Sequence, residues 1–274
     1  MKKSNLLSVL LMLLLLDCGG YERLLKSSDA NLKYTKAFEY YNKGDYAKAG
    51  TLFDQIASFF RGTTKADSVY FFQAMTYFKQ NDFILAGHAF KTFSDTYGNS
   101  PFAENATFNV GYCYYLTSPR PELDQTDTYL AIQSLRLFMI RYPSSTRKEE
   151  CEKMIAEMRN KLVEKSFISA RLYFDLDDYK ASIVALNNSL TEYPESKYRE
   201  DILFLILRSN YMLAINSIQS KQKERFQSAV DEYYSFITEF PESKYRKDAD
   251  RIFESSSRYL TTDETTLNEI NSKQ

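Results

Sequence analysis

Apolar residues recur along most of this chain at spacings of three and four, in blocks that short polar turns separate. The first two blocks show the pattern. One block ends at Tyr40, the turn Lys43-Gly44-Asp45 follows, and the next block begins with Tyr46, Ala49 and Phe53. Residues three and four apart lie on one side of an α-helix. This stretch therefore predicts a helix, a turn and a second helix.

The helix-turn-helix pattern occurs in five copies, each with a small residue in its second helix. These small residues are Ala49, Ala86, Ala131, Ser182 and Ala229. Three positions earlier stand Tyr46, Phe83, Thr128, Tyr179 and Phe226, and four positions later stand Phe53, Phe90, Leu135, Leu186 and Tyr233. Pro143, Pro194 and Pro241 close the last three copies. We expect the small residues to let paired helices approach closely, the large ones to fill the space between copies, and proline to end the second helix.

The spacing of Ala37, Tyr40, Gly44, Tyr46, Ala49 and Phe53 resembles the signature of the tetratricopeptide repeat. This resemblance implies an all-α fold, a right-handed tetratricopeptide-repeat solenoid of about five helix-turn-helix repeats. We assign it to residues 31–260, with a C-terminal capping helix near 246–260 and a polar, frayed tail at 261–274.

The repeats are longer than usual, because successive small residues stand 37, 45, 51 and 47 positions apart, against roughly 34 in the family. We expect a rigid loop from Ser118 to Asp124 inside the third repeat and a long helix over the charged stretch 146–165. A polar insertion from Ser217 to Arg225 falls inside the fifth repeat.

The composition argues against an enzyme. The net charge of −1 gives no basic field for nucleic acid, and the 8 glycines form no phosphate-binding cluster. A single histidine, His88, disfavours histidine metal sites and Ser-His-Asp catalysis. Asp177 and Asp178 fall at the turn and the helix entry of the fourth repeat, where acidic residues stabilise a helix start. We expect no catalytic residue, no metal site and no cofactor other than a covalent lipid.

The N-terminus predicts export. Lys2 and Lys3 precede an apolar run of eleven residues from Leu6 to Leu16, too short to span a membrane but typical of a signal peptide. The following Cys18 resembles the lipidated cysteine of bacterial lipoproteins, although Asp17 departs from the small residue that the family pattern has there. We predict a lipoprotein signal peptide at 1–17, lipid on Cys18 and a linker at 18–30, with the acyl chains holding the protein at a membrane.

Two further cysteines, Cys113 and Cys151, lie in apolar helical contexts. Both suit the role of a small buried hydrophobe. A disulfide between them is possible in an oxidising compartment, but sequence cannot place them within bonding distance.

First helices line the concave groove of a tetratricopeptide solenoid, and here their predicted groove positions are mostly aromatic. The candidate peptide groove comprises Tyr34, Phe38, Tyr41, Phe71, Met75, Phe78, Phe108, Tyr112 and Tyr115. The Lys and Asn residues that clamp a peptide carboxylate in some family members are missing. Such a groove suits an extended or helical peptide with aromatic anchors. The alternative is that these rings are core, since an aromatic stripe at helical spacing usually is.

The order of several local motifs resembles the BamD family of outer-membrane assembly lipoproteins. The motifs are Tyr97-Gly98-Asn99-Ser100-Pro101, the insertion after Ser118, and Arg141-Tyr142-Pro143. The resemblance implies a lipid-anchored scaffold on the periplasmic face of the outer membrane, in the β-barrel assembly machinery. Its implied partners are the periplasmic domains of BamA, other subunits of the machinery and signals in unfolded outer-membrane proteins. Another envelope adaptor, working with cell-wall or division proteins, is the alternative.

Overall fold

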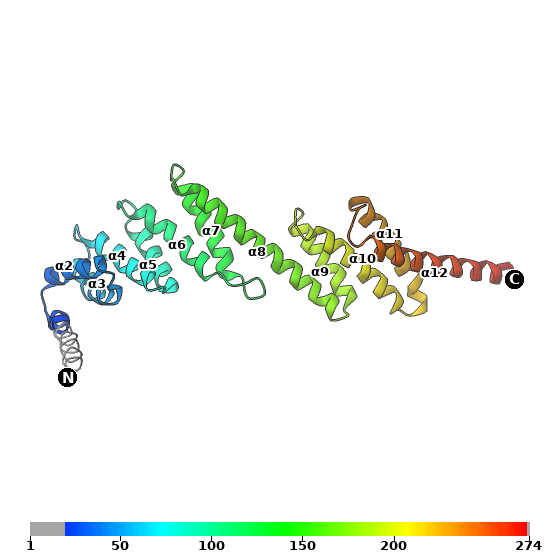
Figure 1. The fold of residues 1–274 in the computed structure, drawn as a ribbon, viewed down its shortest axis with the longest axis horizontal. Helices are drawn as coiled ribbons and strands as arrows, with labels where there is room; N and C mark the ends of the chain where they lie inside the picture. The colour runs from blue at the N-terminus through cyan, green and yellow to red at the C-terminus, as the bar shows by residue number, and fades with distance from the viewer. Residues whose placement is uncertain (1–19, 273–274) are drawn as a thin grey trace, which may run out of the picture. The chain divides into compact units, whose positions relative to one another are not determined.

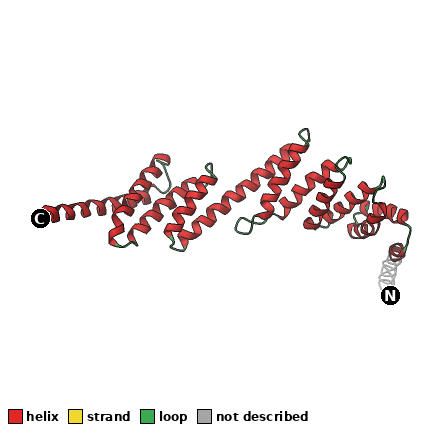
Figure 2. Ribbon diagram, turned by 180° about the vertical axis from the view of Figure 1, so that it is seen from behind, coloured by secondary structure: helices red, strands yellow, loops and turns green. Residues whose placement is uncertain are grey.

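A computed structural model describes residues 20–272 of the chain, with side chains described up to residue 262. Throughout this part the regular structure is α-helical, without strands (Figure 2). The helices are α2 (Ala30–Asn42), α3 (Tyr46–Phe60), α4 (Ala66–Lys79), α5 (Phe83–Thr96), α6 (Ala103–Thr117), α7 (Thr126–Arg141), α8 (Lys148–Asp175), α9 (Tyr179–Glu192), α10 (Arg199–Ile215), α11 (Gln219–Glu239) and α12 (Arg246–Ser272) (Figure 1). They form the five predicted pairs, α2/α3 to α10/α11, followed by a final helix.

The chain divides into two compact units. Unit 1 contains the described residues up to Pro119 together with Gln125–Met158, and so holds the first three repeats. Unit 2 contains Arg120–Asp124 and the chain from Arg159 onward, and so holds α9 to α12.

The turns within repeats form as the acidic residues predict. Asp45, Asp82 and Asp178 each cap the second helix of a pair, accepting a hydrogen bond from the backbone N–H three residues later at 3.3, 3.1 and 3.0 Å. The preceding residue, Gly44, Asn81 or Asp177, has a positive φ of 84°, 62° or 61°. This left-handed residue reverses the chain between the helices, a task suited to Gly, Asn and Asp.

The predicted small residues form the seams between paired helices. All five are fully buried: Ala49, Ala86, Ala131, Ser182 and Ala229. The first helices contribute small buried residues to four of these seams, Ala37, Ala74, Gly111 and Ala170. At Gly111 the approach is so close that a Cβ atom would lie 2.8 Å from Leu135 Cδ2 and 3.1 Å from the Leu135 backbone nitrogen. The predicted tetratricopeptide fold class is confirmed by these seams and by the order of the pairs.

The structure defines three segments more closely than the sequence did. The polar insertion Ser217–Arg225 is mostly helical, because α11 begins at Gln219 and the stretch contains neither glycine nor proline to interrupt it. The final helix does not end near residue 260: α12 continues to Ser272 and extends past α11 (Figure 1). The expected linker is helical over residues 20–26.

That N-terminal helical segment is docked on the first repeat. Leu24 is buried, and the Tyr21 ring meets Tyr40 edge-on with centroids 5.5 Å apart. The Tyr21 hydroxyl also donates a hydrogen bond to the Lys48 carbonyl oxygen at 3.2 Å. The segment between the predicted anchor and the first repeat is therefore part of unit 1.

Cys113 and Cys151 are free and buried, so the disulfide that the sequence left open is absent from unit 1. Burial raises the pKa of the Cys113 thiol to about 12 and that of Cys151 to about 11. Both thiols thus stay protonated and act as small hydrophobic core residues.

Candidate functional site

The nine predicted groove residues all lie on the first helices of unit 1, α2, α4 and α6, at three equivalent positions per helix. The first position holds Tyr34, Phe71 and Phe108. The second holds Phe38, Met75 and Tyr112, and the third holds Tyr41, Phe78 and Tyr115. These positions differ sharply in their surroundings.

The first position is covered by the loop that closes each repeat. The Lys65 ammonium lies 4.6 Å above the centre of the Tyr34 ring. Phe102 stacks on Phe71 with centroids 4.6 Å apart, and these rings are nearly parallel at 12°. Such ring stacking and cation–π contacts stabilise the junction between successive repeats.

Phe108 is covered in the same way, by the Arg147 guanidinium at 4.3 Å from the ring centre. Phe71 and Phe108 are only 7% and 3% exposed. The expectation that these two rings line an open groove is therefore wrong, because the chain's own loops occupy the space above them. They are core residues.

The second and third positions are half-buried, and we call these six residues the aromatic stripe: Phe38, Tyr41, Met75, Phe78, Tyr112 and Tyr115. The Tyr112 ring joins successive helices, with its centroid 5.9 Å from Phe78 and 6.0 Å from Tyr115. The Tyr115 hydroxyl donates a hydrogen bond to Glu157 at 2.6 Å. This bond, together with burial, raises the pKa of Tyr115 to about 12 and fixes the end of the stripe.

One stripe neighbour escaped the sequence analysis. Phe72 is half-buried between α2 and α4, with its centroid 4.9 Å from Phe38 and 5.0 Å from Tyr41. It joins the rings of the first repeat to those of the second. The run Tyr70-Phe71-Phe72 gave no signal for it, because three consecutive rings point to different sides of a helix.

In unit 2 the first position again holds a covered aromatic ring, but the second position holds a different type of residue. Phe167 and Phe204 lie under Tyr198 and Tyr245, stacked at 4.6 and 4.2 Å. The second position, aromatic or methionine in unit 1, holds Arg171 and Arg208 in unit 2.

The covering tyrosines belong to the two copies of Pro-Glu-Ser-Lys-Tyr-Arg at 194–199 and 241–246. The arginine of the first copy makes a two-pronged ion pair with Glu239, one prong at 2.9 Å. The lysine of the second copy, Lys244, pairs with Asp201 at 2.8 Å, and Tyr245 donates to the same carboxylate. The first copy therefore joins the start of α10 to the end of α11, and the second copy joins the loop before α12 to α10.

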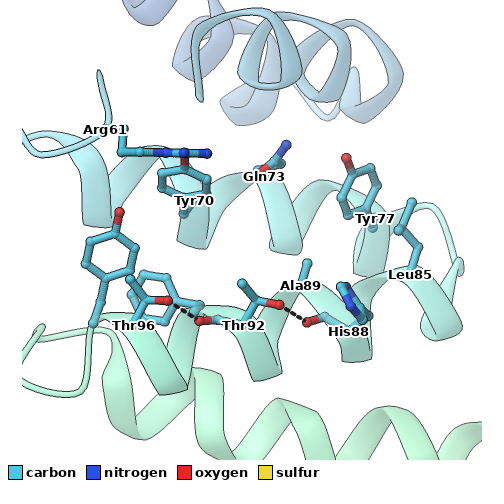
Figure 3. Close-up of a pocket in the computed structure, with 11 residues that line it drawn as sticks. Arg61, Tyr70, Gln73, Tyr77, Leu85, His88, Ala89, Thr92 and Thr96 are labelled. Carbon is cyan, nitrogen blue, oxygen red and sulfur yellow. Dashed lines mark hydrogen bonds between the residues drawn. The ribbon is translucent and has the colours of Figure 1, made fainter. Parts of the chain in front are cut away.

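A second concave feature lies in unit 1, on another side of α4. We call it the outer trough, a cavity of about 400 Å³ between α4 and α5 with Arg61 at one end (Figure 3). Its lining is Arg61, Tyr70, Gln73, Tyr77, Leu85, His88, Ala89, Thr92, Phe93, Thr96 and Tyr97. Sequence analysis missed it, because none of these residues forms a recognisable motif.

The acidic turn of the fourth repeat is structural, as predicted, since Asp178 caps α9. Among the described residues no group of three or more His, Cys, Asp or Glu side chains is placed to hold a metal ion. Cys18, the predicted lipidation site, lies outside the described residues. No described helix is long and apolar enough to cross a membrane.

Residues 26–226 match the family YfiO, whose description is outer membrane lipoprotein. This chain belongs to that family. The match spans the five repeats up to the start of the last second helix, and it assigns the protein to the outer membrane lipoproteins.

A curated relative points the same way. A protein of Aquifex aeolicus (strain VF5), provisionally named outer membrane protein assembly factor BamD, is 24% identical over 232 residues, which cover 83% of this chain and 75% of that protein. The resemblance to the BamD family that the motifs indicated is thereby confirmed at the level of the family.

Solved tetratricopeptide structures align only weakly. The TPR2AB domain of yeast Sti1, in complex with pHSP90, gives a TM-score of 0.37 at 12% identity, covering 83% of this chain and 98% of that one. The TPR domain of P58(IPK) gives 0.41 at 13% identity, covering 88% and 68%. The fold class therefore rests on this chain's own helix pairs and buried seams.

Proposed function

We propose that this outer membrane lipoprotein is a non-enzymatic scaffold subunit of the machinery that assembles β-barrel proteins in the outer membrane. The observation that carries the proposal is the family match over residues 26–226, together with the name of the Aquifex aeolicus relative. The architecture agrees with such a role, since stacked helix pairs provide extended surfaces for other proteins.

In this proposal the protein is anchored to the periplasmic face of the outer membrane. The signal peptide at 1–17 directs export, and Cys18 carries the lipid. The docked segment at 20–26 supports this arrangement, because it packs against the first repeat and so keeps Cys18 close to that repeat. A lipid with several acyl chains holds such a protein stably at a membrane.

We further propose a division of labour between the units. The aromatic stripe of unit 1 binds segments of unfolded outer-membrane proteins, because its partly exposed rings can pack against apolar side chains of the bound segment. Unit 2 binds the periplasmic domains of BamA, as the family resemblance implies, and its arginine-bearing second positions offer charge that the stripe lacks. Other assembly subunits are expected to join the same complex.

The test is an affinity purification of the full lipidated chain from its own envelope in mild detergent, with co-purifying proteins identified by mass spectrometry. Recovery of an outer-membrane barrel with periplasmic repeat domains, in comparable amount, supports the proposal. Recovery of cell-wall or division proteins without such a barrel would assign the chain to another envelope adaptor role.

The anchor is tested separately with Cys18→Ser. The wild-type chain is expected to remain in the membrane fraction after washing in high salt, whereas the variant is released. A variant that stays in the membrane fraction would contradict the lipid anchor.

A further inference from the structure

The outer trough has no part in the proposed function, and it lies on a different side of α4 from the aromatic stripe. Its α4 residues are Tyr70, Gln73 and Tyr77, whereas the stripe uses Met75 and Phe78. At about 100° per residue, the centres of these two sets lie roughly 135° apart around the helix. A ligand could therefore occupy the trough without touching the stripe.

The trough offers apolar surface and few free polar groups. Gln73 and Tyr77 donate to Asp54 Oδ1 at 2.7 and 2.6 Å, so the polar rim on α4 is already engaged. On α5, the Thr92 and Thr96 hydroxyls donate to carbonyl oxygens of their own helix at 3.0 and 2.8 Å. The partner must therefore bring mostly hydrophobic side chains.

One end of the trough is cationic. Arg61 is exposed and donates a hydrogen bond to the Tyr70 hydroxyl at 3.4 Å, and it forms no ion pair with a carboxylate of the described chain. The lining of the trough includes no Asp or Glu. Charge complementarity therefore calls for a negative group at this end of the ligand.

The walls determine the backbone form of the ligand. They are α-helices, whose backbone N–H and C=O groups are bonded within each helix. An extended peptide laid between them would gain no backbone hydrogen bonds from the walls, and its own backbone groups would depend on water. A helix satisfies those groups internally. The span from Tyr70 to Tyr77 is about 10 Å, or two helical turns.

The trough recurs one repeat later. A cavity of about 230 Å³ lies between α6 and α7, lined by Val110 and Tyr114 where the first has Gln73 and Tyr77. Its rim holds Leu137, 59% exposed, as the first trough holds Leu85, 42% exposed. Exposed leucines beside a cavity are typical of docking surfaces.

We propose that the outer trough is a docking site for an amphipathic helix of a partner protein. The helix carries large apolar residues at positions i, i+3 or i+4, and i+7, and an acidic residue that pairs with Arg61. The apolar residues fill the trough between α4 and α5, with Leu85 closing over them.

The experiment places a photo-crosslinking amino acid at position 85 of the full lipidated chain in its own cells, and sequences the crosslinked peptides by mass spectrometry. The expected product is a segment of another envelope protein with the stated helical spacing and an acidic residue at one end. Crosslinking only to lipid or to a second copy of this chain, to a segment without that spacing, or to nothing would overturn the proposal.

Two variants sharpen the result. Ala89→Trp fills the trough and Arg61→Glu reverses its charge, and each is expected to lower the crosslink yield at least tenfold. Ile84→Trp is the matched control: it adds the same ring to α5 at an exposed position outside the trough, and the yield should be retained. Since Arg61 is exposed, its variant is expected to fold, which thermal unfolding by circular dichroism checks. A yield unaffected by Arg61→Glu would refute the charge pairing.

Discussion

The two units share one repeat register, and they differ in chemistry at the position that follows the seam. Each first helix carries a buried residue at the seam: Ala37, Ala74 and Gly111 in unit 1, Ala170 and Leu207 in unit 2. The next residue along the chain faces away from the seam. It is Phe38, Met75 or Tyr112 in unit 1, but Arg171 or Arg208 in unit 2.

This difference distinguishes the position that stabilises the stacking of repeats from the position that is available for binding. The first-position ring is present and covered in both units, so it serves the stacking of repeats. The second position is not needed for stacking, because aromatic, thioether and guanidinium side chains all occur there. In unit 2 the Arg208 guanidinium lies 4.8 Å from the centre of the Phe174 ring and still faces solvent. The residue after the seam is therefore where each unit acquires its own binding chemistry.

The largest effect is expected at the covered first position. Phe71→Ala in unit 1 and Phe204→Ala in unit 2 should each lower the free energy of unfolding by about 3–5 kcal/mol, because each removes a buried ring and leaves a cavity. Urea unfolding followed by circular dichroism measures the change. Met75→Ala, at a half-buried position, should cost clearly less. Equal losses of unfolding free energy in Phe71→Ala and Met75→Ala would contradict the proposed distinction between the first and second positions.

The next effect concerns the ion pairs of unit 2. Asp201→Asn removes the carboxylate that Lys244 and Tyr245 share, and should cost about 1–3 kcal/mol at pH 7. Burial alone would raise the pKa of Asp201, but the hydrogen bonds from Lys244 and Tyr245 bring it below its ordinary value. The ionised form therefore stabilises the fold at neutral pH, and this contribution disappears as the pH falls through the lowered pKa.

Urea unfolding at neutral and acidic pH checks this sign. The stability difference between the wild type and Asp201→Asn should be full above the ordinary Asp pKa of 3.8 and should shrink below it. Asp248→Asn is the control, because its pair with Arg251 is exposed and should contribute under about 0.5 kcal/mol. A pH-independent difference would contradict the role of the Asp201 charge.

A third prediction exchanges the residue types at the second position between the two units. Met75→Arg places a charge in the aromatic stripe and should weaken binding of a synthetic peptide, matching the last strand of an outer-membrane β-barrel, at least tenfold. This corresponds to about 1.4 kcal/mol. Fluorescence anisotropy measures the affinity. Arg208→Met in unit 2 should leave it unchanged, and a loss of the same size there would show that the peptide does not bind the stripe.

The smallest effect is expected for surface ion pairs of unit 1. Lys91→Ala removes a pair with Asp95 whose side chains are 63% and 66% exposed, so the loss should be under about 0.5 kcal/mol. Arg246→Ala in unit 2 should cost more, because Asp250 is bound there by both Arg246 and Tyr233. Thermal unfolding of the two variants under the same conditions compares them.

Much of the helical framework could be predicted from local signals. The helix starts after Asp45, Asp82 and Asp178 follow from side-chain capping, and the stops before Pro143, Pro194 and Pro241 follow from proline's missing N–H. Where such signals are absent, the predicted bound was wrong. No glycine or proline follows Arg246 within α12, so this helix continues past residue 260 to Ser272.

The candidate site was predicted less well. Phe71 and Met75 share the same helical periodicity, yet one is core and the other half-buried, because Phe102 covers only the first. Periodicity identifies a shared face of a helix but not what lies on top of it. Arg208 was not singled out for a related reason. Its position becomes informative only when it is compared with the equivalent residues of unit 1.

The sequence by itself determined the number of helix pairs, their seams and their turns, because these depend on interactions between residues close together in the chain. The tertiary structure alone decided which rings are covered, where the outer trough lies and which charges pair. Those outcomes depend on contacts between residues far apart in the chain, such as Lys65 above Tyr34 or Arg199 with Glu239, which are 31 and 40 positions apart. No local pattern encodes such contacts, because the two partners lie in different helices or loops.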